Sequence, residues 1–141
     1  MGFDLWIADA CRTADVSYHD FILTIAAGGY PCLPGATPGS PRTFNETDLL
    51  ALYVYGRLLA FGIGALRAGE YAGRVHNALR VDADATFIAI LLMPRGGKRV
   101  VVDLGPQAPL RSEKIEFNIA AIREFLSRRI ECLCEEQTQG Q

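Results

Sequence analysis

The chain has little cysteine and no excess of basic residues, and both shortages narrow what it can be. Four cysteines in 141 residues are too few for a fold held together by disulfides. We therefore expect reduced thiols and a cytoplasmic protein. Lysine and arginine number 14 against 16 aspartates and glutamates, a formal charge of −2. Net charge alone gives no reason to expect a nucleic-acid-binding protein.

The chain also lacks a stretch suited to a membrane. Crossing a bilayer takes about 20 mostly apolar residues, and an arginine near its middle costs several kcal/mol. The most apolar long window, residues 49–68, contains Arg57 and Arg67. Residues 1–10 carry two aspartates and lack the basic start of a signal peptide. We therefore expect no membrane association.

Apolar residues in helical spacing dominate the first half of the chain, and half of all residues are hydrophobic. Residues 5–30 predict two short helices, and Ser17 or Asp15 can cap the second. Residues 31–42 hold four prolines and two glycines, which predicts a loop because proline lacks a backbone donor. Asn45 is typical of a helix N-cap, so a third helix is expected from there to Gly62. A fourth helix is expected over residues 65–79.

The pattern of apolar residues changes in the second half of the chain, from helical spacing to runs rich in β-forming residues. Residues 86–93 and 99–104 are β-rich runs around a glycine-containing connection, which predicts a hairpin. A final helix is expected from about residue 112 to 134, followed by a disordered tail over 136–141. One face of that helix carries an apolar seam: Ile115, Ile119, Ile122, Leu126 and Ile130.

These elements predict an α+β fold that is mostly helical. Residues 4–80 form a helical N-terminal domain. Residues 84–135 form a hairpin-plus-helix module for dimerisation or sensing.

Short motifs follow one another in a set order along residues 4–80. They are WIADAC (6–11), VSYH (16–19), GGYP (28–31), RTFNETDL (42–49) and GIG (62–64). In this order they resemble the winged helix-turn-helix of the MerR family, with residues 31–42 in the place of the wing. The resemblance implies a transcriptional regulator that binds double-stranded DNA as a homodimer.

The resemblance also implies which residues meet DNA and which join the dimer. Hydroxyl, imidazole and guanidinium groups suit phosphates and base edges. The positions carried over are Arg12, Thr13, Ser17, Tyr18, His19 and Arg42. The seam of the final helix would join two chains, as a helix after the DNA-binding domain does in that family. The same seam would equally suit a helix that covers the hairpin within one chain.

Departures from the family point to an alternative function. The family usually has an arginine where this chain has Ile22, and residues 31–40 contain no basic residue. Residues 1–80 carry six basic against seven acidic side chains, whereas DNA affinity draws much on basic ones. A protein-binding adaptor, built on a winged-helix fold that has lost DNA binding, is therefore the alternative.

No motif indicates an enzyme, a metal or a cofactor. The sequence contains neither the G-x-S-x-G of hydrolases nor the H-E-x-x-H of zinc proteases. Cys132 and Cys134 would point about 200° apart on a helix, so they do not easily bind one metal ion. We expect no catalytic residues, no metal site and no cofactor.

Overall fold

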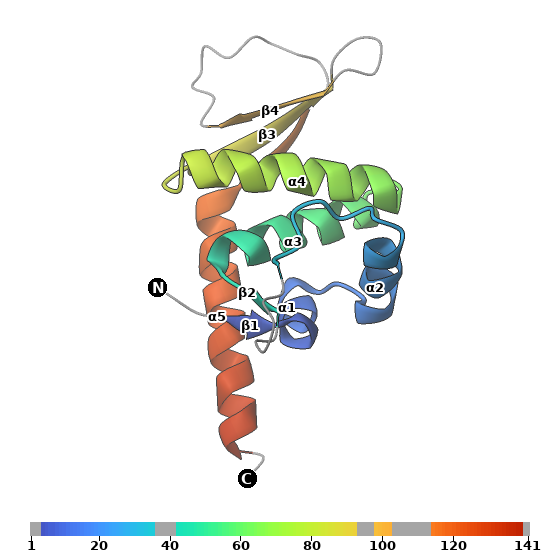
Figure 1. Cartoon of the computed structure of the whole chain (residues 1–141). Coiled ribbons are helices and arrows are strands. Elements are labelled where there is room, and N and C mark those ends of the chain that lie inside the picture. The colour runs from blue at the N-terminus through green and yellow to red at the C-terminus, as the bar shows by residue number, and fades with distance from the viewer. Residues whose placement is uncertain (1–3, 36–41, 93–97, 103–113, 140–141) are drawn as a thin grey trace.

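The fold combines five helices with two small sheets among the residues that the structure describes. It is a computed structural model that describes residues 4–35, 42–92, 98–102 and 114–139. The α+β, mostly helical class is confirmed (Figure 1). The elements, in chain order, are β1 (Leu5–Trp6), α1 (Ile7–Ala14), α2 (Tyr18–Ala26), β2 (Thr43–Phe44), α3 (Glu46–Ala60), α4 (Ala65–Val81), β3 (Phe87–Leu92), β4 (Lys98–Val102), β5 (Lys114–Asn118) and α5 (Ile119–Gln139).

A two-residue antiparallel pair joins the start of the chain to the end of the Pro/Gly-rich segment. Leu5 of β1 lies opposite Phe44 of β2, and Trp6 opposite Thr43. The predicted first helix therefore begins later than expected, at Ile7. The pairing partner is nearly forty residues away in the sequence, so no local pattern marks Leu5 as a strand residue.

Helices α3 and α4 form the centre of the molecule, and Figure 1 shows α4 lying between α3 and the larger sheet. The predicted start of α3 is confirmed by a full capping box. The Asn45 side chain accepts from the Asp48 backbone N–H at 2.9 Å, and the Asp48 carboxylate accepts from the Asn45 N–H at 3.0 Å. The helix ends before Gly62, whose φ of 91° is a conformation that glycine adopts without strain.

The larger sheet has three antiparallel strands in the order β4-β3-β5. The predicted hairpin is confirmed: Ile88 of β3 lies opposite Val102, and Leu92 opposite Lys98. Its connecting residues, 93–97, lie outside the described part. The start of the final helix at about residue 112 is wrong, because residues 114–118 form β5 on the other edge of β3. Ile88 and Ile90 of the central strand are fully buried.

Helix α5 runs along the side of the molecule (Figure 1) and contacts α1, α3 and the sheet. Ile119, Ile122 and Leu126 belong to one core cluster that includes residues of both predicted units. The helix continues to Gln139, past its expected end at about residue 134 and into the expected tail, whose residues 140–141 lie outside the described part. Among the described helices, none has the length and apolar content needed to cross a membrane.

Candidate functional site

A three-residue turn sets where α2 begins. Helix α1 ends at Asp15, whose φ of 59° is left-handed, and the Val16 N–H donates to the Cys11 carbonyl at 2.8 Å. The Ser17 hydroxyl accepts from the Asp20 N–H at 3.3 Å and caps the new helix, which decides between Ser17 and Asp15, the two caps that the sequence left open. The first turn of α2 therefore starts at Tyr18.

Aromatic rings hold the inner side of α2. The Phe21 ring lies edge-on to the Tyr30 ring, with 4.7 Å between the ring centroids. Its centroid lies 5.6 Å from that of the Tyr55 ring. The hydroxyls of Thr24 on α2 and Tyr55 on α3 are hydrogen-bonded at 2.8 Å. Burial raises the pKa of Tyr55, and the bond to Thr24 offsets part of that shift. Ring packing and a buried hydrogen bond together fix α2 against α3.

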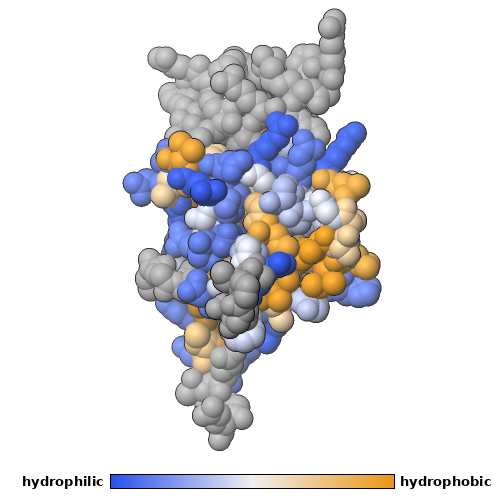
Figure 2. All heavy atoms as spheres, viewed as in Figure 1, coloured by the Kyte–Doolittle hydropathy of each residue, from blue (hydrophilic) through white to orange (hydrophobic). Residues whose placement is uncertain are grey.

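The outer side of α2 is open and largely apolar. Tyr18 is 49% exposed and Leu23 is 56% exposed, with His19 and Asp20 also on the surface. Figure 2 shows hydrophobic side chains gathered over α2. Leu66 of α4 lies close to the end of this helix, because a Cβ built on Gly29 would approach its Cδ2 to 2.5 Å. We call the exposed side chains of Ile22, Leu23 and Leu66 the apolar patch.

Three of the predicted DNA-contacting residues lie together at the start of α2. Tyr18 and His19 are exposed neighbours in its first turn, and the exposed Ser17 precedes them. The Ser17 hydroxyl already accepts the capping hydrogen bond. Tyr18 and His19 are therefore the two side chains of this group that no described contact occupies.

The other three predicted contact residues have different surroundings. The prediction that Thr13 contacts DNA is wrong. Thr13 is fully buried and its hydroxyl donates to the Asp9 carbonyl at 2.8 Å, so this side chain is unavailable to DNA. Arg12 is exposed, and its Nη2 atom lies 3.6 Å from Oε2 of Glu136 in α5. Arg42 is half-buried just before β2, and its buried Nε has no hydrogen-bond partner within the described residues.

The apolar seam proposed for the dimer is largely filled within one chain. Ile119, Ile122 and Leu126 are at most 9% exposed, so they are not available to a second chain. Ile115, which lies in β5 rather than in the helix, and Ile130 are partly buried against the same core. Of the two alternatives that the sequence left open, the intramolecular one accounts for these side chains.

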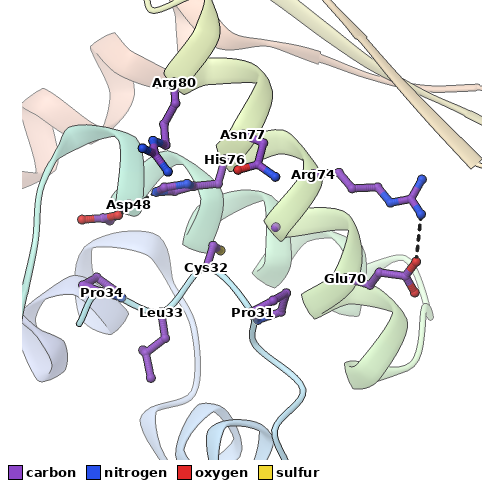
Figure 3. A pocket seen from close by; sticks show the side chains of 11 residues that line it. Pro31, Cys32, Leu33, Pro34, Asp48, Glu70, Arg74, His76, Asn77 and Arg80 are labelled. Carbon is purple, nitrogen blue, oxygen red and sulfur yellow. Dashed lines mark hydrogen bonds and ion pairs between the residues drawn. The ribbon is translucent and has the colours of Figure 1, made fainter. Parts of the chain in front are cut away.

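A pocket that the sequence did not indicate lies between the start of the Pro/Gly-rich segment and α4 (Figure 3). Its volume is about 430 Å³. At its wall, the Nε2 atom of His76 lies 2.8 Å from Oδ1 of Asp48. Burial raises the pKa of the Cys32 thiol, which also lines the pocket, from 9.0 to about 11. The one sequence signal for this pocket is the Gly69–Gly73 spacing, which leaves a smooth face on α4.

The cysteines do not gather into a binding site. All four are outside disulfides: Cys11 is buried, Cys32 is half-buried, and Cys132 and Cys134 are exposed on α5. Among the described residues, no group of three or more histidines, cysteines and carboxylates is arranged to hold a metal ion.

Comparisons with known proteins find a partial similarity to an enzyme. No family model matches the chain. Over 92 residues the chain is 32% identical to the tRNA-specific 2-thiouridylase MnmA of Mycobacterium sp. (strain KMS), and equally to that of strain JLS. The match covers 61% of this chain and 25% of the relatives, so the chain spans about a quarter of their length. Where the sequence led us to expect no enzyme, the chain is thus similar to part of one.

Proposed function

We propose that the protein is a DNA-binding transcriptional regulator that acts as a homodimer through a winged helix-turn-helix over residues 4–80. The observation that carries the proposal is the pair Tyr18 and His19, exposed together on the first turn of α2. The opposite side of that helix is held by Phe21 and by the Thr24–Tyr55 hydrogen bond. A recognition helix needs this combination, because its N-terminal residues read base edges from a rigid support.

The exposed face of α2 offers several kinds of contact. The Tyr18 hydroxyl and the His19 imidazole can hydrogen-bond to base edges or phosphates, and Leu23 can contact a thymine methyl group. The positive end of the α2 dipole favours a phosphate, whereas the Asp20 carboxylate disfavours one. Few basic side chains take part, so we expect modest affinity with a shallow dependence on salt.

The test is a fluorescence-anisotropy titration at low salt against pooled duplex fragments of the source genome, with total tRNA as a second ligand. Sedimentation of the same sample measures the oligomeric state. The proposal predicts a dimer that prefers duplex DNA. Absence of DNA binding by the folded protein, or tighter binding to tRNA, contradicts it.

The apolar patch favours a second candidate function, a protein-binding adaptor. Leu23 and Leu66 are 56% and 62% exposed, and large apolar side chains that share one surface are typical of protein-binding sites. A photoreactive benzophenone residue placed at position 23 separates the candidates in the producing cells. Cross-links to DNA support the regulator, and cross-links to one defined protein support the adaptor.

The similarity to the 2-thiouridylase does not extend the proposal to catalysis. The matched region is a quarter of that protein, whereas an enzyme's name describes the activity of its whole chain. The tRNA arm of the titration tests the nucleic-acid preference that such a relationship would imply.

A further inference from the structure

The pocket beside α4 has walls from three separate parts of the chain. One wall is the start of the Pro/Gly-rich segment, with Pro31, Leu33 and Pro34; another is Asp48 at the start of α3. Figure 3 shows His76, Asn77 and Arg80 of α4 together on the side opposite the prolines. Apolar groups thus face polar donors across about 430 Å³, which is within the usual volume of a small-molecule site.

Close backbone contacts fix the distance between these walls. A Cβ built on Gly69 would lie 1.8 Å from the Gly29 carbonyl oxygen, and one on Gly73 would lie 2.8 Å from the Pro31 ring. Both helix positions therefore need glycine for the segment to approach α4 this closely. The Asp48 wall is equally fixed, since its two carboxylate oxygens are held by Asn45 and His76. The pocket is a preformed feature of the packed chain.

Among the described residues, one cationic side chain that lines the pocket has no partner. Arg74 pairs with Glu70 at 3.2 Å, and Asp48 contacts His76 at 2.8 Å. Arg80 has no hydrogen bond or ion pair with any residue that the structure describes. A guanidinium presents parallel N–H donors that match a carboxylate or a phosphate.

The surroundings of Arg80 favour a carboxylate with an organic body. Two carboxylates, Asp48 and Glu70, also line the pocket and would repel a phosphate dianion more strongly than a monoanion. Asn77 offers an additional amide donor, and Pro31 and Leu33 offer an apolar surface that water covers poorly. A small apolar monocarboxylate satisfies both sides of the pocket at once.

From this geometry we infer that the pocket binds a small organic monocarboxylate at Arg80, and that the bound ligand regulates the DNA binding proposed above. The regulatory half rests on the proposed function. The ligand contacts Leu33 of the segment and Arg80 of α4 at the same time. A ligand that binds the DNA-competent conformation of the chain with a different affinity from its other conformations changes the DNA affinity by the same factor.

Binding is tested on the protein alone. Benzoate and hexanoate are titrated as probes into 15N-labelled protein and followed by NMR, with inorganic phosphate as the comparison anion. We expect the amide signals of Leu33, His76 and Asn77 to shift. The R80Q variant should bind the carboxylates about tenfold more weakly or worse, because a charge-assisted hydrogen bond is lost. Arg67 is exposed on the same helix but lies outside the pocket, so the R67Q variant should bind them like the parent protein.

Each contrary result overturns a stated part of the inference. The site is overturned if neither benzoate nor hexanoate binds, or if R80Q does not weaken their binding. It is also overturned if phosphate binds more tightly than both probes. DNA affinity is then measured with and without saturating benzoate. If DNA binds with equal, measurable affinity in both conditions, the regulatory half is overturned. If DNA binds in neither condition while benzoate still binds, the proposed function and the regulatory half that rests on it are both contradicted, and the site stands.

Discussion

His76 of α4 and Asp48 of α3 are joined by a 2.8 Å contact although 28 residues separate them in the sequence. The second oxygen of the same carboxylate accepts the Asn45 N–H at 3.0 Å and completes the capping box of α3. One buried carboxylate side chain therefore both caps the start of α3 and joins α3 to α4.

The D48A variant should be less stable than the parent by about 2 kcal/mol, because a helix cap and a contact to His76 are lost together. Urea denaturation measures the change. D84A, which removes an exposed carboxylate with no described partner, is the control and should be near neutral. Equal effects of the two substitutions would contradict the double role of Asp48.

The T24V variant should cost about 1–3 kcal/mol, because it leaves the buried Tyr55 hydroxyl without its partner. Y55F removes the other hydroxyl. If the two hydroxyls stabilise each other, the double variant T24V/Y55F costs less than the sum of the single variants. Strict additivity in urea denaturation would show that the bond does not hold α2 on α3.

The G69A variant should be strongly destabilised, by more than about 2 kcal/mol, although alanine is the better helix former. The added Cβ would collide with the backbone carbonyl of Gly29, which cannot move without displacing the segment. G64A is the control, since a Cβ there has open space. Equal thermal unfolding temperatures for G69A and G64A would refute the close approach.

Local sequence signals predicted most of the helical elements. They did not predict strand pairings between residues that are far apart in the sequence. The Asn45–Asp48 cap and the β3–β4 hairpin have signals within a few residues. Strand β5 was missed because Ile115 and Ile119 are four apart, a spacing that also suits one face of a helix. Its strand character depends on the free edge of β3.

The candidate site was predicted in part for the same reason. The exposed start of α2 follows from the cap at Ser17, one of the two caps that the sequence offered. The burial of Thr13 depends on how α1 packs against distant helices. The His76–Asp48 contact and the pocket beside it join residues that no local pattern connects.

The two inner thiols should react slowly with iodoacetamide. Burial raises the pKa of Cys11 and of Cys32 from 9.0 to about 11, so the reactive thiolate is about 100-fold scarcer below pH 9. Mass spectrometry should find the exposed Cys132 and Cys134 modified first, with the inner pair catching up as the pH approaches 11. Equal rates at all four thiols of the folded protein would contradict this order.

The same shifts predict a loss of stability in alkali. Below pH 9 the two thiols are neutral in both the folded and the unfolded chain. Between about pH 9 and 11 the unfolded chain ionises them first, so the stabilisation is lost as the pH rises through that window. Urea denaturation across this range should give a falling free energy of unfolding, and C11A should lessen the fall; an unchanged fall would rule out Cys11 as a contributor.

The most direct measurement compares the duplex-DNA affinity of the parent protein with that of Y18A/H19A and of R67Q, at low salt and with folding verified. If α2 reads DNA, the double variant binds about tenfold more weakly or worse, since two hydrogen-bonding side chains are lost, while R67Q binds like the parent. If the double variant matches the parent, or if the folded parent does not bind duplex DNA at all, α2 is not a DNA-reading helix.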